Sequence, residues 1–271
     1  VFFSANPEHH IVVQRVTPLS HSSFLDAIHD RRDASNDTSV LVYVHGFNMD
    51  FAEALKRAAQ IVFDFQYRGT PIAFSWPSNG GPFAYGSDRE DALWSIRHLE
   101  RFLLKLKEEI PDRKINIIAH SMGNIALLNA LRFIAIQHPD KALFDNIILA
   151  APDFDADLFS KQIAGETEHL ADNWVVYVSK HDRALQVSIS LNEAPRLGLA
   201  PPTVVDGYQI IDASEIAVSS WDISGSHSYF ASHRSVITDM VEVLEGLAPT
   251  VRSGLREQFS DGGRFWTIRS P

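Results

Sequence analysis

The sequence predicts the α/β class, a mainly parallel central sheet with helices on both faces, on three observations. Six short segments are apolar throughout, as are strands that a sheet buries on both faces. They are Ser39–Val44, Pro71–Trp76, Ile115–Ala119, Asn146–Ala150, Trp174–Ser179 and Tyr208–Ala213. Amphipathic stretches of helical period alternate with them, and parallel strands require such crossover helices. The length of 271 residues, 45% hydrophobic and 21% charged, is typical of one large globular domain.

The N-terminal part, residues 1–38, carries the weakest signals. The apolar runs Val1–Phe3 and Ile11–Val13 predict one or two edge strands. A short helix is expected at Phe24–His29, followed by a polar loop. The regular alternation begins only at Ser39.

Capping residues mark the starts of two helices between the first and third strands. Asp50 followed by Glu53 has the pattern of a capping box, in which each side chain bonds the other residue's backbone. Ser87 with Glu90 repeats the pattern and predicts one long helix that ends at about Glu109.

The second half of the chain continues the alternation with less regular connections. Helices are expected up to about Ala135 and from about Phe230 to Leu247. The stretch 183–206 is irregular and holds Pro195, Pro201 and Pro202, which predicts a surface excursion or small cap. The tail 249–271 has little periodicity and is expected either to wrap the domain or to be partly mobile. Neither an internal repeat nor a linker divides the chain, so we expect a single domain over 1–271.

The segment 119–123, Ala-His-Ser-Met-Gly, joins a buried strand to a helix and fits the pattern small-x-Ser-x-Gly of a nucleophile elbow. Small residues are needed two positions either side of the serine, because larger side chains would collide with the neighbouring backbone. The turn lifts the Ser121 hydroxyl above the sheet edge and aims a helix N-terminus at it. We therefore expect Ser121 as a nucleophile and the Met122 N–H as an oxyanion donor. The alternative is a chance match in which Ser121 only caps the helix.

The turn His45-Gly46-Phe47 follows the first apolar strand. It is expected to supply the second oxyanion donor, the Phe47 N–H, and Gly46 permits the close backbone approach that this requires. Otherwise it is an ordinary strand-to-helix turn in which His45 bonds locally.

A serine hydroxyl needs a base, and histidine is the side chain suited to that task at neutral pH. Among 12 histidines, His227 follows the last apolar strand in a loop of small residues and is the expected base. His233 is the alternative, although it falls inside the predicted final helix. His120 adjoins the serine and is expected to pack or bond structurally.

An orienting carboxylate is expected after a strand end, between the serine and the histidine in the chain. Asp182 follows the fifth apolar strand and meets this condition. Asp153, one strand earlier, is the alternative acid. Such a triad would transfer an acyl group to Ser121 and then to water.

Several segments together carry a family resemblance. They are Val44–Asn48, Phe74–Ser78, Tyr85 with Asp88-Arg89-Glu90, Ala119–Asn124, Ala150–Asp153 and Asp182–Leu185. They resemble the α/β-hydrolase superfamily and, within it, a predominantly bacterial family of hydrolases of unknown function. The resemblance implies the α/β-hydrolase fold over about residues 39–247, with the chain order Ser, Asp, His, and an esterase- or lipase-like activity. It names no substrate.

Three further side chains are candidates for the substrate pocket. Trp76 and Tyr85 come in or near the loop after the second strand, and His45 lies beside the oxyanion turn. The alternative is that the aromatic rings wedge this loop against the core.

We expect a cofactor-independent serine hydrolase that cleaves small carboxylic esters. An amidase or thioesterase with the same triad and a non-catalytic binding protein of this fold are the alternatives. The net charge of −10 disfavours nucleic-acid binding, and the absence of cysteine excludes thiolate metal sites and a Cys nucleophile. No metal, nucleotide or flavin motif occurs.

The sequence leaves the compartment and the oligomeric state open. Its longest apolar runs are far shorter than the roughly 20 residues that a transmembrane helix needs. No basic and apolar leader opens it, but the first residue is Val, so a signal removed ahead of it stays possible.

Overall fold

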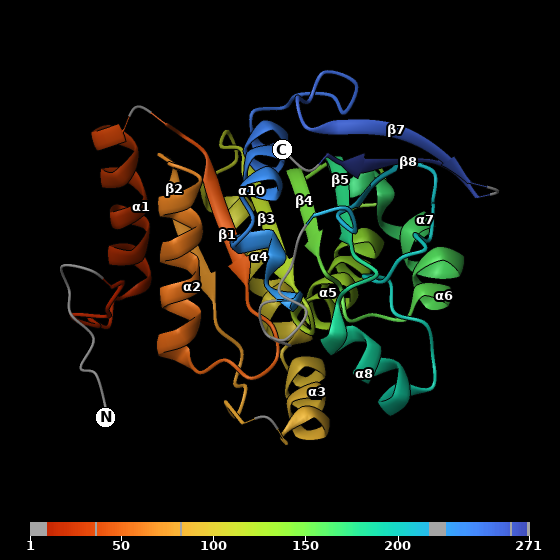
Figure 1. Ribbon diagram of the computed structural model, residues 1–271. Coiled ribbons are helices and arrows are strands. Elements are labelled where there is room, and N and C mark those ends of the chain that lie inside the picture. Colours follow the sequence, from red (N-terminus) through yellow and green to blue (C-terminus); the bar gives the residue numbers. More distant parts are fainter. Residues whose placement is uncertain (1–9, 36, 82, 217–225, 261, 270–271) are drawn as a thin grey trace.

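An eight-stranded sheet runs through the centre of the computed structural model, which describes residues 10–35, 37–81, 83–216, 226–260 and 262–269. The strand order is β2-β1-β3-β4-β5-β6-β8-β7 (Figure 1). The strands are β1 (Val40–Val44), β2 (Thr70–Phe74), β3 (Ile115–His120), β4 (Phe144–Ala150), β5 (Ala171–Val178), β6 (Tyr208–Asp212), β7 (Leu255–Ser260) and β8 (Gly263–Ile268). Every neighbouring pair is parallel except β7 with β8. The α/β class predicted from the apolar runs is confirmed.

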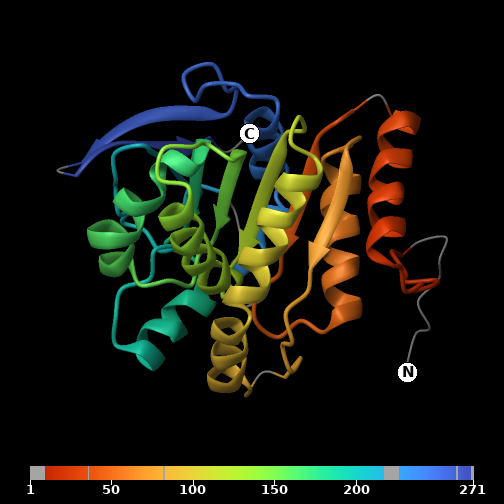
Figure 2. The same cartoon turned by 180° about the vertical axis from the view of Figure 1, so that it is seen from behind.

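Helices cover both faces of this sheet, as the two opposite views in Figures 1 and 2 show. The longer ones are α1 (His21–Ser35), α2 (Phe51–Asp64), α3 (Tyr85–Trp94), α4 (Ile96–Glu109), α5 (Gly123–Gln137), α8 (Arg183–Asn192) and α10 (Arg234–Leu244). The short helices α6 (Ala156–Leu158) and α7 (Ala164–Thr167) lie between β4 and β5.

Alternate residues of a strand point to opposite faces, so each strand contributes to two hydrophobic clusters. On β1, Val42 packs in the cluster that includes α4, α5 and Ile28 of α1. Its neighbour Tyr43 packs in the cluster that includes α2 and α10. The strands therefore read as continuous apolar runs because both of their faces are buried.

The structure corrects the prediction of one long helix from Ser87 to about Glu109, because two helices, α3 and α4, lie there instead. The residue before α3 is Ala84, and Ser87 lies inside the first turn, where its hydroxyl donates to the Ala84 carbonyl. At the junction of α3 and α4, the Ser95 hydroxyl donates back to the Asp91 carbonyl at 2.7 Å, a bond that bends helices. The capping box of Asp50 and Glu53 at the start of α2 is confirmed.

The N-terminal expectation is also corrected. Among the described residues up to 38 there is no strand, and the helix α1 is longer than predicted because Ser20 caps it by accepting from the Ser23 N–H at 3.2 Å. The run Val1–Phe3 lies outside the described residues.

The two irregular C-terminal stretches prove to be regular in part. The stretch 183–206 begins with the helix α8, whose capping residue is Asp182. The tail 249–271 contains the hairpin β7–β8, which extends the sheet by pairing Ile211 of β6 with Trp266. Arg252 fixes its base, because its buried guanidinium contacts Asp239 of α10 at 3.2 Å. These strands escaped prediction because only Leu255 of β7 is buried, so this strand has neither a continuous apolar run nor a regular alternation.

Candidate active site

The elbow at Ser121 has the geometry that its small neighbours predict. Ser121 has φ +53°, a left-handed conformation that costs free energy in a non-glycine residue. A Cβ at Gly123 would overlap the His45 carbonyl oxygen, and one at Gly46 would lie 2.9 Å from the Ser121 Cβ. The backbone of the strand-to-helix turn and that of the turn after β1 therefore approach closely only because both residues are glycine.

Two backbone amides lie where the sequence predicts oxyanion donors. Met122 is the residue before α5, and Phe47 follows Gly46 in the turn after β1. Within the described part of the chain, neither the Met122 N–H nor the Phe47 N–H has a hydrogen-bond partner. Free amides at a helix N-terminus are suited to receive a negatively charged oxygen.

His227 and Asp182 form a close pair. The His227 Nδ1 lies 2.7 Å from the Asp182 Oδ2, and the carboxylate is fully buried. The other carboxylate oxygen accepts the Leu185 N–H at 3.0 Å, so the same side chain caps α8. Burial lowers the pKa of His227 and the Asp182 carboxylate raises it; the carboxylate prevails, and the pKa lies above its ordinary value.

His120 supports the His227 loop from the other side. Its ring lies 4.6 Å from the His227 ring and 4.4 Å from the Phe230 ring, centroid to centroid. Its Nε2 donates to the His227 carbonyl at 3.3 Å. Burial holds the pKa of His120 well below its usual value, so the ring is neutral. This agrees with the structural role expected for His120. The alternative base, His233, is the residue before α10 and is absent from the residues that line the pocket at Ser121.

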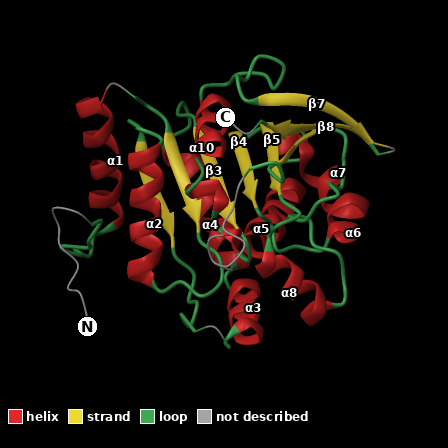
Figure 3. Cartoon of the chain, in the orientation of Figure 1, coloured by secondary structure: helices red, strands yellow, loops and turns green. Residues whose placement is uncertain are grey.

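A pocket of about 1200 Å³ opens at these residues. Ser121, His227, Tyr85 and Asp153 line it, together with residues of α2 and α8. Figure 3 shows α3 and α8 beyond the arrowheads of the central strands and α2 to one side. Ligands of parallel sheets bind at this carboxyl edge. Among the described residues no hydrogen bond joins the Ser121 Oγ to His227, a contact that in unliganded hydrolases often tightens only with substrate.

His45 and Trp76 do not line this pocket, which corrects their expected place in it. Both are buried behind the oxyanion turn, with their rings stacked at 4.8 Å. The His45 Nδ1 donates to the Gly46 carbonyl at 2.9 Å, its Nε2 accepts the Trp76 N–H at 3.1 Å, and the Trp76 Nε1 donates to the His45 carbonyl at 2.7 Å. Burial lowers the pKa of His45, which keeps the ring neutral as this bonding requires. The two residues hold the turn that carries the Phe47 amide.

Asp88 was not singled out from the sequence as a site residue, yet its buried carboxylate organises the loop opposite the oxyanion turn. It accepts hydrogen bonds from the Ser78 hydroxyl at 2.5 Å, from the Asn79 N–H at 2.8 Å and from the Asn48 N–H at 3.4 Å. Two signals were available in the sequence: the Ser-Asn pattern after Trp76-Pro77, and the place of Asp88 in a segment that carries the family resemblance.

Asp153 lines the same pocket as His227, but the His227 Nδ1 is bonded to Asp182 instead. Its carboxylate accepts from the Tyr85 hydroxyl at 2.9 Å and from the Ser188 hydroxyl at 2.6 Å, and lies 3.6 Å from the Arg196 guanidinium. Its backbone N–H donates to the Ser121 carbonyl at 3.2 Å. Tyr85 lines the pocket. Ser188 and Arg196 come from the stretch 183–206 that sequence reasoning left irregular.

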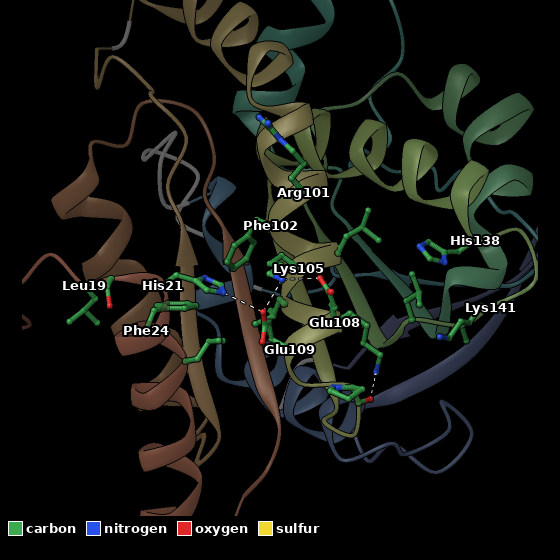
Figure 4. Close-up of a pocket in the computed structure, with 18 of the residues that line it drawn as sticks. Leu19, His21, Phe24, Arg101, Phe102, Lys105, Glu108, Glu109, His138 and Lys141 are labelled. Carbon is green, nitrogen blue, oxygen red and sulfur yellow. Dashed lines mark hydrogen bonds and ion pairs between the residues drawn. The ribbon is translucent and has the colours of Figure 1, made fainter.

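A second pocket, of about 1400 Å³, lies at the opposite end of the sheet (Figure 4). It is formed by α1, the C-terminal part of α4 and the segment between α5 and β4. His21 bonds Glu109 across it at 3.3 Å, and Lys105 contacts Glu108 and Glu109. None of the predicted site residues lies there.

Two further features are absent from the residues that the structure describes: a cluster of metal ligands and a membrane-spanning helix. No group of three or more His, Asp or Glu side chains could hold a metal ion in the part of the chain that the structure describes. Of the helices described, none has the length and apolar character needed to cross a membrane.

Comparison with known proteins gives a family match over most of the chain. A sequence model of the family described as alpha/beta hydrolase of unknown function (DUF900) matches residues 20–244. An uncharacterized protein of Nostoc sp. (strain PCC 7120), alr1448, is 28% identical over 159 residues. That alignment covers 47% of this chain and 41% of the relative, so the chain spans less than half the length of the protein it matches.

Solved structures with a related arrangement are distant in sequence. A predicted CIB-like hydrolase from Thermoplasma acidophilum is 13% identical, with 78% of this chain and 88% of that chain covered and a TM-score of 0.45. Carboxylesterase CesB (YbfK) from Bacillus subtilis is 10% identical, with 78% and 85% covered and a TM-score of 0.43. Neither is similar enough to transfer an activity.

Proposed function

The chain belongs to the alpha/beta hydrolase family of unknown function, and from this premise we propose that it is a serine hydrolase that cleaves carboxylic esters. Ser121 is the proposed nucleophile, His227 the base and Asp182 the orienting acid. The observation that carries the proposal is the 2.7 Å contact between His227 and the buried Asp182, in the same pocket as a serine held at positive φ.

In the first proposed step, the Ser121 oxygen attacks the ester carbonyl carbon while the His227 Nε2 takes the hydroxyl proton. Asp182 accepts from the Nδ1–H, fixes the tautomer that leaves a lone pair on Nε2 and stabilises the imidazolium that forms. The Met122 and Phe47 N–H groups receive the charge on the carbonyl oxygen. One such donor is typically worth about 3–4 kcal/mol in the transition state.

In the second half of the reaction, His227 returns the proton to the leaving alcohol and the acyl group stays on Ser121. Water then attacks the acyl carbon as His227 removes its proton, and the carboxylic acid is released with the Ser121 hydroxyl restored. These steps need no cofactor. An amide or thioester could pass through the same steps, and the ester is proposed as the least demanding substrate.

The test is labelling with a fluorophosphonate probe, alongside hydrolysis of p-nitrophenyl esters of increasing acyl length. We expect labelling and turnover in the wild type and loss of both in Ser121→Ala and His227→Ala. The matched control is His233→Ala, which should keep both. Undiminished labelling of Ser121→Ala would overturn the nucleophile, and no labelling of a folded wild type would favour the binding-protein alternative.

A further inference from the structure

A cluster of polar side chains on the pocket wall has no part in the proposed steps. Asp153, Tyr85, Ser188 and Asn192 come from the end of β4, from α3 and from α8, and the first three line the pocket at Ser121. The Asp153 side chain is 3% exposed. A buried carboxylate is costly unless it is paired, so its place beside a nucleophile needs an explanation.

The hydrogen-bond donors of this cluster are directed inward. The Tyr85 and Ser188 hydroxyls both donate to the Asp153 carboxylate. The Asn192 Nδ2 donates to the Tyr85 oxygen at 2.8 Å and to the Ser188 oxygen at 3.1 Å. Burial and the Asp153 charge raise the pKa of Tyr85, so its proton stays in place. The capacity left over is the acceptor capacity of the carboxylate and hydroxyl oxygens, which suits a ligand that donates a hydrogen bond.

The charges nearby favour a neutral donor over a cationic one. The Arg196 guanidinium, itself almost fully buried, lies 3.6 Å from the Asp153 carboxylate and offsets its charge. Lys56 and Arg57 of α2 add positive charge to the other wall of the same pocket. An ammonium group would therefore meet three cations against two carboxylates, Asp153 and Glu53, and Arg196 already offsets the first of these. A hydroxyl group can use the free acceptors without a charge of its own.

We propose that Asp153, Tyr85 and Ser188 form a subsite for a neutral hydroxyl group beside Ser121, so that the natural ester carries a hydroxyl on its acyl or its alcohol part. The inference rests on the proposed serine-hydrolase function. The cluster also ties α3 to α8, so its test needs a readout that a purely structural role would not move.

That readout is the preference between matched esters. Glycerol monobutyrate and propyl butyrate differ only in the two hydroxyl groups of the alcohol part. p-Nitrophenyl 6-hydroxyhexanoate and p-nitrophenyl hexanoate differ only in one hydroxyl group at the end of the acyl chain. A bond from a substrate hydroxyl to this charged cluster should give a preference of about 10- to 100-fold in kcat/KM for one hydroxylated ester. The pair of esters that shows this preference tells whether the natural substrate carries its hydroxyl group on the acyl part or on the alcohol part.

The variants are Tyr85→Phe and Ser188→Ala, which remove one hydroxyl each and leave the Asp153–Arg196 pair. Each should reduce the preference, the ratio of kcat/KM for the hydroxylated ester to kcat/KM for the plain one, at least several-fold. Any change in the reactivity of Ser121 itself is measured separately by the rate of fluorophosphonate labelling. Asp153→Asn, which keeps the shape, should reduce it further. Ile189→Ala, on an outer position of α8, is the control and should keep the preference.

Three results would overturn the inference. Equal kcat/KM within both pairs, in an enzyme that is labelled and cleaves the plain esters, removes the subsite but leaves the hydrolase. A stronger preference for the matched ammonium esters removes the neutral-hydroxyl assignment. A folded wild type that is neither labelled nor active on any ester removes the hydrolase and the subsite together.

Discussion

Replacing Asp182 by Asn tests the acid of the proposed triad with little change in shape. Among the described residues, the Asp182 carboxylate has two hydrogen-bond partners, the His227 Nδ1 at 2.7 Å and the Leu185 N–H at 3.0 Å. Asn can keep the second, because it caps helices as well as Asp does. Towards His227 it would present its NH₂ group, which forces the ring into the tautomer with Nδ1 unprotonated. The Nε2 then carries the proton and cannot accept one from Ser121.

The expected loss follows from that tautomer. We expect kcat to fall by about 10⁴-fold, or about 5 kcal/mol in activation free energy, with the free energy of unfolding changed by about 1 kcal/mol or less. The assay is p-nitrophenyl ester hydrolysis with urea unfolding alongside. A smaller loss in Asp182→Asn than in Asp153→Asn, on plain esters, would refute the assignment of the acid.

The same pair makes a prediction about pH. The Asp182 carboxylate raises the pKa of His227 above its ordinary value against the effect of burial, so the wild-type kcat/KM should rise with pH through a limb above about 6.5 as His227 loses its proton. Because the folded pKa is the higher one, this pair stabilises the fold at low pH, and the contribution is lost as pH rises through that limb. In Asp182→Asn the limb of the residual activity should move to lower pH.

Other parts of the structure give three more predictions. Trp76→Phe removes the hydrogen bond from Nε1 to the His45 carbonyl, which should lower the free energy of unfolding in urea by about 1–2 kcal/mol. It should also lower kcat more than it raises KM. An unchanged kcat would show that the ring does not position the oxyanion turn. Burial raises the pKa of Asp239 to about 6 despite Arg252, so the contribution of the protonated Asp239 side chain to stability is present below about pH 4 and is lost as the pH rises to about 6. Asp239→Asn should therefore flatten the dependence of the free energy of unfolding on pH in that window. Parallel profiles of the wild type and the variant would contradict this. Gly123→Ala should abolish fluorophosphonate labelling and lower the melting temperature, because its Cβ would overlap the His45 carbonyl, and labelling at the wild-type rate would mean that the turn can widen.

The parts of the molecule that sequence predicts well are those fixed by local physics. Continuous apolar runs predict the buried strands. The small residues on either side of Ser121 predict the sharp turn between strand and helix. The pairing of His227 with Asp182 follows from the rule that the carboxyl ends of parallel strands share one edge.

The parts that sequence misses depend on contacts between distant segments. Whether Tyr85 and Ser188 meet at Asp153 depends on where α3 and α8 pack, and no local pattern specifies that. The β7–β8 hairpin is fixed by its pairing with β6 and by the buried Arg252, so its own half-exposed sequence carries only a weak strand signal. His45 and Trp76 are close in sequence to residues of the candidate site. Only the stacking of their rings shows that they support the oxyanion turn from behind and do not line the pocket.

The order in which the site residues leave the ribosome follows from their places in the chain. About 100 residues separate Ser121 from His227. At a synthesis rate of about 5–20 residues per second, the proposed nucleophile emerges roughly 5–20 s before its proposed base. During that interval the nascent chain carries a serine hydroxyl without its proton acceptor, since Asp182 and His227 both follow later. The proposed triad is therefore incomplete until His227 has left the ribosome.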